Sequence, residues 1–279
     1  MRLAYVVTAY KQPEQFKRLL DAVWHPDDVF AVHVDAKAPE AVRKAFEAAA
    51  QGRANVRFID PIRVAWGGFG LCEAEWRGIS SLVATGGSWD FLMNITAQDF
   101  PLKRRDEILA ELGRRPGANF MDVKRLDTLP GHYTRRGQWL CWEVRDKVRR
   151  LPIPNLPPRG FRNDYYGIGF HVLSRAFCDW LTETPLMAEC RSFFRRTWHP
   201  HEHWLQAMIM ASPFRDTVVA DNKRHIRWIG DTGHPRVLTL ADLPELEASK
   251  AFFGRKFDLA VDADVMTALE RRLRLRVAA

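Results

Sequence analysis

The segment HPHEHW (199–204) places one carboxylate among three imidazoles. Pro200 suits the first position of a helix, and apolar residues follow at helical spacing, so we expect Glu202 in a first helical turn. A glutamate there can act as a general base, or it can simply interact with the helix dipole, which is worth about 0.3–1 kcal/mol. His199, His201 and His203 alternate, and they could share a zinc ion only if the segment were extended, because positions i and i+2 of a helix do not face each other.

Two cations stand within an aromatic run near the end of the chain, where Arg255 and Lys256 lie between Phe253 and Phe257. Such a pair is less typical of a solvated face, and it could neutralise a departing diphosphate as a metal ion would. The alternative is a pair of long side chains that snorkel at a strand edge. Arg236, in GHPRVLTL, could add a further positive charge to the same leaving group.

Carboxylates stand singly at the places where a divalent cation would be held in many sugar-nucleotide enzymes. Asp35 lies in HVDAKAP and Asp99 in TAQDFPL, and neither is part of a D-x-D pair. A hard cation usually needs more charged oxygen than one carboxylate supplies. We therefore expect no metal and no resident cofactor, with basic side chains in the role of the metal.

The elements that must position these residues alternate between strand and helix in the first part of the chain. Buried-strand runs at 2–9, 29–34, 55–60, 89–96 and 118–123 are separated by helical patterns at 13–24, from 39 to about 50, after the Gly-rich loop at 67–70, and at 103–113. This alternation is typical of a mostly parallel sheet with helices on its faces, so the predicted fold class is α/β. Ligands bind beyond the carboxyl ends of such strands, where Thr8, Asp35, Trp66 and Asp99 fall.

The second half is less regular. The sequence predicts a strand at 167–173, helices near 174–183, 200–211, 241–248 and 262–274, and one or two strands within 217–229. Residues 151–163, rich in Pro and Arg, are expected to form an extended connection. We expect one compact domain over 1–279, with a nucleotide-binding half at 1–123 and an acceptor-binding and catalytic half at 124–279.

Composition leaves several partners open. The formal net charge is +8, which suits a phosphate-bearing ligand, an anionic membrane surface or a polyanion, so a non-enzymatic polyanion-binding module stays an alternative. The four cysteines match neither a zinc nor a disulfide pattern, and reduced thiols are expected. No run approaches ~20 apolar residues and a strand begins near Met1, so we expect a cytoplasmic protein without signal peptide or membrane span. Peripheral contact with the inner face of the cell membrane is compatible with the basic groups.

Nine segments in order resemble the core-2/I-branching β-1,6-N-acetylglucosaminyltransferase family, which includes peptide O-xylosyltransferases. The segments are VVTAYKQPEQFKRLL, VHVDAKAP, VAWGGFGLCEAE, WDFLMNITAQDFPL, YYGIGFHVLSRAF, HPHEHWLQAMIMAS, RHIRW, GHPRVLTLADLPEL and FFGRKFD. The resemblance implies a GT-A-type fold, no metal, and transfer of a sugar from a UDP-sugar to a carbohydrate hydroxyl with inversion at the anomeric carbon.

The resemblance also implies roles for single residues. Glu202 matches the catalytic base, Arg236 and Lys256 match the pair that neutralises the diphosphate, and Arg255 is expected to assist them. The positions expected to contact the uridine and the donor sugar are Thr8, Ala9, Tyr10, Asp35, Trp66 and Asp99. Those expected to contact the acceptor are Trp228, Gly167 and Phe170.

The chain departs from the family at Gly169 and Phe170, where the xylosyltransferase branch carries an Asp-Trp pair. This departure favours N-acetylglucosamine over xylose as the transferred sugar, with xylosyl transfer as the alternative. We expect the acceptor to be a glycan or glycolipid in the synthesis of a bacterial surface polysaccharide. A zinc-dependent hydrolase built on His199, His201 and His203 is the remaining alternative, from a different class of enzyme.

Overall fold

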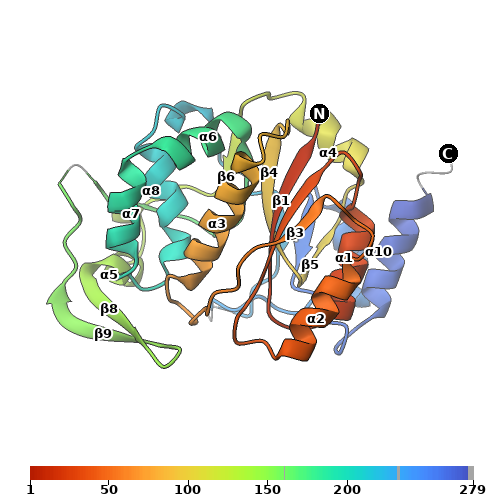
Figure 1. Cartoon of the computed structure of the whole chain (residues 1–279), viewed down its shortest axis with the longest axis horizontal. Helices are drawn as coiled ribbons and strands as arrows, with labels where there is room; N and C mark the ends of the chain where they lie inside the picture. The colour runs from red at the N-terminus through yellow and green to blue at the C-terminus, as the bar shows by residue number, and fades with distance from the viewer. Residues whose placement is uncertain (160, 231–232, 276–279) are drawn as a thin grey trace.

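A seven-stranded sheet forms the centre of the computed structural model, which describes residues 1–159, 161–230 and 233–275 (Figure 1). Residue 160, within the expected connection at 151–163, and residues 276–279, at the end of the expected domain, lie outside this description. The spatial order of the strands is β12 (Val218–Val219), β6 (Asn119–Met121), β11 (His171–Ser174), β4 (Phe91–Thr96), β1 (Leu3–Ala9), β2 (Val29–Val34) and β3 (Val56–Phe58). β1 pairs in parallel with β2 and β4, and β2 with β3, whereas β11 runs antiparallel to β4 and β6.

Helices cover both faces of the sheet because its strands are apolar on both faces. Leu3, Tyr5 and Val7 of β1 belong to one buried cluster, and Ala4 and Val6 to the other. The first cluster packs under α1 (Pro13–Val23), α2 (Glu40–Ala49), α4 (Arg105–Leu112), α9 (Leu243–Ala248) and α10 (Asp264–Leu275). The second packs under α3 (Gly70–Ala84), α6 (Arg175–Glu183), α7 (Leu186–Phe194) and α8 (Trp204–Met210), and Figure 1 shows the two layers on opposite sides of the strands.

Smaller elements surround the carboxyl end of the sheet. A three-stranded sheet joins β13 (Arg224–Ile226), β14 (Phe253–Arg255) and β5 (Asp99–Pro101), which brings residues 253–255 beside the strand that follows β4. β7 (Lys124–Arg125) pairs with β10 (Tyr165–Tyr166), and β8 (Trp139–Val144) with β9 (Lys147–Pro154). The remaining elements are α5 (Gly131–Gln138) and the 3₁₀ turns Leu126–Thr128, Pro200–Glu202, Arg215–Thr217 and Leu240–Asp242.

The predicted α/β class, a mostly parallel sheet flanked by helices as expected of a GT-A-type fold, is confirmed. Strands from both sides of position 123 share the central sheet. The four cysteines are buried and unpaired. Within the described residues, no helix combines the length and the apolar character needed to cross a membrane.

One local expectation holds only in part and another is wrong. The connection at 151–163 begins inside β9, because residues 147–154 pair with β8 across a turn at Arg145 and Asp146. The helix expected over 200–211 is broken at His203, whose φ of −135° separates a 3₁₀ turn from α8. Pro200 supports the turn as readily as it would a longer helix, since it fixes only its own φ.

Candidate active site

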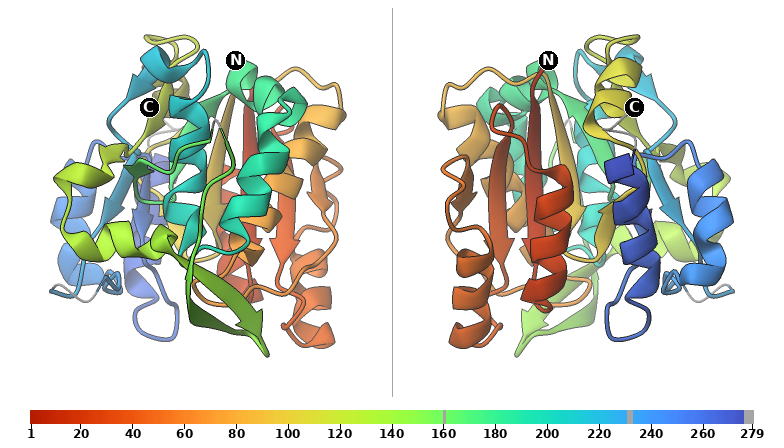
Figure 2. Two further views of the ribbon diagram at one scale, coloured as in Figure 1. Left: turned by 90° about the vertical axis from the view of Figure 1, so that its left-hand side faces the viewer. Right: turned by 90° about the vertical axis from the view of Figure 1, so that its right-hand side faces the viewer.

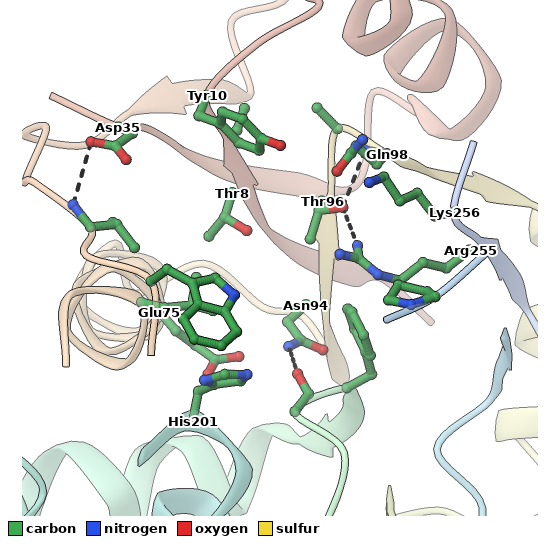
Figure 3. A pocket seen from close by; sticks show the side chains of 18 of the residues that line it. Thr8, Tyr10, Asp35, Glu75, Asn94, Thr96, Gln98, His201, Arg255 and Lys256 are labelled. Atoms are coloured by element: carbon green, nitrogen blue, oxygen red, sulfur yellow. Dashed lines mark hydrogen bonds between the residues drawn. The ribbon is translucent and has the colours of Figure 1, made fainter. Parts of the chain in front are cut away.

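A cavity of about 580 Å³ opens at the carboxyl ends of β1, β2 and β4, as expected for an α/β sheet. Its walls come from segments far apart in the sequence. Figure 3 shows Glu75 and His201 on one side, Arg255 and Lys256 on the other, and Thr8 and Asn94 between them. The predicted site residues that line this cavity are Thr8, Ala9, Tyr10, Asp35, Trp66, Phe170, Glu202, Trp228, Arg255 and Lys256.

Asp35 holds the loop that forms the nucleotide side of the cavity. Its Oδ1 accepts hydrogen bonds from the backbone N–H of Lys37 at 2.9 Å and of Val64 at 3.4 Å, and its own N–H donates to the carbonyl of Ala9. The carboxylate is therefore already engaged by the chain, and it fixes the loop leading to Trp66. That indole is 66% exposed at the cavity mouth, where it meets the ring of His199 edge-on.

The cationic wall consists of Arg255 and Lys256, which differ in their ion-pair partners. Arg255 donates from Nη1 to Oδ1 of Asp99 at 2.9 Å and to Oγ1 of Thr96 at 2.6 Å. Asp99 itself is fully buried and does not line the cavity. Its contribution is to hold the guanidinium of Arg255. Lys256 forms no ion pair with any described residue; burial, together with the charges of Lys11 and Arg255, lowers its pKa. Its ammonium is thus the less compensated of the two charges.

Arg236 is not brought into the cavity. Its guanidinium pairs with the carboxylate of Asp242, which is also paired with Arg227. Pro235 lines the cavity, whereas Arg236 does not. A contact between Arg236 and the leaving group would require this ion pair to open, and its role there stays a prediction.

Glu202 lies on the cavity wall at the end of the 3₁₀ turn, with its side chain 20% exposed. Nη1 of Arg136, from α5, donates to its Oε2. Burial alone would raise the pKa of Glu202, but the neighbouring His201 and Arg136 lower it below its ordinary value. Burial also lowers the pKa of His201, which is then neutral near pH 7, so the permanent charge that keeps Glu202 ionised is Arg136.

The three histidines separate into two groups. Ligand atoms of His199, His201 and Glu202 lie within 4.8 Å of one another, so these three could approach one ion. His203 is fully buried and its Nδ1 lies 3.0 Å from the carbonyl of Tyr165, outside that group. The three-histidine zinc arrangement is therefore not formed. Burial lowers the pKa of His199 and of His203 to about 4 in each case, so both rings are neutral near pH 7.

The acceptor-side residues have different positions. Trp228 is 44% exposed at the rim, and Phe170 packs against the guanidinium of Arg255 with 4.9 Å from Cζ to the ring centre. Gly167 does not line the cavity; its N–H donates to the carbonyl of Glu202, and a Cβ there would lie 1.8 Å from the backbone oxygen of Asp122. Gly167 thus positions Glu202 through the backbone.

Other residues at the site were not singled out as site residues from the sequence. Arg136 was visible only as part of a basic stretch, and its distance of 66 positions from Glu202 gives no local signal. Asn94 clamps the loop after β10, since its Nδ2 donates to the carbonyl of Gly169 and its Oδ1 accepts from His171 N–H. Glu75, on α3, lies 2.8 Å from Nε2 of His171 and lines the cavity.

Comparison with known proteins identifies the family of this chain. A protein-family model described as Core-2/I-Branching enzyme matches residues 3–249. Xylosyltransferase 2 of Rattus norvegicus is 29% identical over 98% of this chain and 34% of its own length. A β-1,3-galactosyl-O-glycosyl-glycoprotein β-1,6-N-acetylglucosaminyltransferase 3 of Bos taurus is 25% identical over 98% of this chain and 67% of its own length.

The chain thus spans about a third of the length of the rat relative. Among solved structures, mouse xyloside xylosyltransferase 1 is similar at 10% identity over 91% of this chain and 97% of that one, with a TM-score of 0.43. The relatives are glycosyltransferases, as the sequence predicted. Because the family match covers most of its residues, the chain belongs to the core-2/I-branching enzyme family.

Proposed function

We propose that this protein is an inverting glycosyltransferase that transfers a sugar from a UDP-sugar to a hydroxyl of a glycan or glycolipid, with Glu202 as the base. One observation carries the proposal. A carboxylate held ionised by Arg136 and an ammonium without an ion-pair partner among the described residues line the same cavity. A one-step displacement requires these two charges, one for the incoming hydroxyl and one for the leaving group.

In the proposed reaction, the acceptor hydroxyl lies against the Glu202 carboxylate. The oxygen attacks the anomeric carbon while its proton passes to Glu202, and the bond from that carbon to the diphosphate oxygen breaks on the opposite face. UDP departs with the electron pair, and Lys256 and Arg255 meet its growing charge. Asp99 has an indirect part, since it holds the guanidinium of Arg255 in place.

The donor groups at the strand ends suit a reaction without a metal ion. Oδ1 of Asp35 accepts two backbone N–H groups and its Oδ2 lies 3.8 Å from Nζ of Lys37, while Asp99 is paired with Arg255, so each carboxylate already has a partner within the chain. Mg²⁺ or Mn²⁺ would need one or two uncommitted carboxylates besides the phosphates. We infer that the cationic side chains replace the ion.

N-acetylglucosamine is the proposed sugar, and xylose is the second candidate because rat xylosyltransferase 2 is similar over nearly the whole chain. A Cβ on Gly169 would lie 2.9 Å from Cδ2 and from the backbone oxygen of His201. The aspartate expected here in the xylosyltransferase branch would therefore displace the wall beside Glu202. The proposed role is in the synthesis of a bacterial surface polysaccharide, on the cytoplasmic side of the membrane.

The other two candidate functions have lost their support. The zinc hydrolase needed His203, which points away from the cluster, and family membership favours a transferase. A non-enzymatic polyanion-binding module does not account for a cavity in which Glu202 and Lys256 converge.

The test combines two variants with complementary expectations. Glu202→Gln should lose about 10²–10⁴ in transfer rate while thermal stabilisation by UDP stays intact. Lys256→Met should weaken the stabilisation by UDP, which for a ligand at 100 times its Kd is about 2.7 kcal/mol. Exposed residues provide matched controls, Glu40→Gln and Lys250→Met, and neither should change transfer or UDP binding.

Transfer should be measured with UDP-N-acetylglucosamine and UDP-xylose in excess EDTA. Full activity of Glu202→Gln would refute the base assignment. Activity lost to EDTA and restored by Mn²⁺ would refute metal independence, and turnover of UDP-xylose alone would replace the proposed sugar by the alternative.

A further inference from the structure

The β8–β9 hairpin stands out from the body of the protein at the end where the cavity opens. Figure 1 places it at the lower left, and in both views of Figure 2 its tip lies at the bottom of the molecule. The pairings Trp142 with Arg149 and Val144 with Lys147 define one face of the hairpin, because residues directly opposite each other share a face. The second face carries Cys141 and Glu143.

The face with Cys141 and Glu143 turns toward the protein. Oε1 of Glu143 accepts the N–H of Phe69 at 2.7 Å, and the N–H of Cys141 donates to the carbonyl of Arg196 at 2.8 Å. A Cβ on Gly68, which lines the cavity, would lie 2.3 Å from Oε1 of Glu143. The inner face is therefore seated against the cavity wall.

The outer face is open and combines apolar with basic side chains. Trp142 and Val144 of this face are 61% and 47% exposed. Beyond the register shift near Trp139, the apolar side chains of Ile153 and Leu156 are 50% and 79% exposed. These apolar side chains are exposed along one hairpin that also carries cations, a combination that suits an interaction surface.

Positive charge dominates the same hairpin. No described residue forms an ion pair with Arg145 of the turn or with Lys147 and Arg149 of the outer face; Arg150 is likewise unpaired among the described residues, but it lies opposite Cys141 and shares the inner face. The acids of the hairpin are both engaged, Glu143 by the backbone of Phe69 and Asp146 by Arg63 at 2.6 Å. Apolar side chains flanked by uncompensated cations are complementary to an anionic lipid surface. On such a surface a tryptophan lies at the level of the headgroups, and each Lys or Arg raises the affinity by about tenfold or less.

We propose that the outer face of the β8–β9 hairpin docks on the anionic surface of a membrane and thereby holds the cavity over a lipid-linked acceptor. The identity of the acceptor rests on the proposed function, whereas membrane docking stands on the hairpin alone. Docking on this face keeps the rim formed by Gly68 near the headgroups, because the inner face of the hairpin contacts it.

The experiment measures co-sedimentation of the full chain with vesicles of phosphatidylglycerol and phosphatidylcholine, compared with vesicles of phosphatidylcholine alone. The protein should bind the anionic vesicles and bind less as salt rises. Lys147→Ser with Arg149→Ser should weaken binding by about tenfold or more. Trp142→Ser with Ile153→Ser should also release the protein and should remove the fraction that survives high salt.

The matched control is Arg114→Ser with Arg115→Ser, which removes the same charge from exposed positions after α4, at the opposite end of the molecule. This control should bind vesicles like the parent. Unchanged melting temperatures of all variants would show that the fold is kept, as their exposed positions lead us to expect.

Transfer to a soluble acceptor analogue separates the two proposals, since hairpin variants should keep that activity. The docking proposal is overturned if the parent ignores anionic vesicles, if the control variant loses as much as the hairpin variants, or if the protein binds RNA but no vesicles. Loss of vesicle binding together with normal soluble transfer supports it; absence of any transfer in the parent counts against the proposed function and leaves the docking result standing.

Discussion

Replacing Arg136 by methionine removes the charge next to Glu202 while keeping most of the side-chain volume. The two side chains are 17% and 20% exposed, so the ion pair is largely shielded from water. The guanidinium of Arg136 also lies against the rings of Tyr133 and Tyr166, at 5.1 and 5.6 Å from Cζ to the ring centres. Methionine can retain part of that packing, so the variant tests mainly the charge.

The expected magnitude has a stability part and a rate part. Truncating one partner of a fully buried ion pair costs about 3–5 kcal/mol, and with the partial exposure here we expect about 1–3 kcal/mol at neutral pH. Each kcal/mol corresponds to a fall in Tm of about 2–4 °C for a chain of this size. The rate should fall by up to about 10²–10⁴ at pH values where Glu202 becomes protonated.

The dependence on pH follows from the direction of the pKa shift. In the parent, the lowered pKa of Glu202 stabilises the fold above the ordinary pKa of glutamate, and this contribution is lost as the pH falls through the folded-state value. In Arg136→Met, less positive charge opposes the effect of burial, so the pKa of Glu202 rises. The acid limb of kcat/KM should therefore move to higher pH, with activity recovering as the solution becomes more alkaline.

The assay is kcat/KM between about pH 4.5 and about pH 8.5, together with thermal unfolding over the same range. Arg135→Met, an exposed neighbour on α5, is the matched control and should leave the profile unchanged. In a Glu202→Gln background, Arg136→Met should cost little further rate, because the group it acts on is gone. A loss in Arg136→Met that is constant across the pH range, or fully additive with Glu202→Gln, would refute this account.

Two further predictions concern the same wall of the cavity. Gly167→Ala should destabilise the protein by about 1–3 kcal/mol and lower transfer, since its Cβ would lie 1.8 Å from the backbone oxygen of Asp122. Gly131→Ala, where nothing lies within 4 Å, should be near neutral in thermal unfolding, and equal effects of the two would contradict the steric argument. Added Zn²⁺ should inhibit transfer, because the neutral rings of His199 and His201 and the carboxylate of Glu202 can approach one zinc ion. Mg²⁺ should not inhibit, because it prefers oxygen ligands. His199→Gln should be less sensitive to Zn²⁺ in the same titration; activation by zinc would argue against metal independence.

The sequence by itself determined the parallel part of the sheet and the end at which the site lies. Apolar runs such as 3–9 and 29–34, separated by amphipathic helices, are typical of a layered α/β fold, and the parallel pairing of β1 with β2 and β4 agrees with that prediction. That architecture places Thr8, Asp35, Trp66 and Asp99 at or beyond the carboxyl ends of the strands without further information. The motif HPHEHW also singled out Glu202, although the helix predicted over 200–211 is too long.

Only the tertiary structure decided which charges meet. Arg136 reaches Glu202 across 66 positions and Arg255 reaches Asp99 across 156, and no periodicity encodes such pairs. Arg236 was expected beside Lys256, but Asp242, six positions further on, pairs with it outside the cavity. The two-sided character of the β8–β9 hairpin was hidden for the same reason. Local sequence fixes backbone preference, whereas the partner of a long charged side chain depends on where distant segments pack.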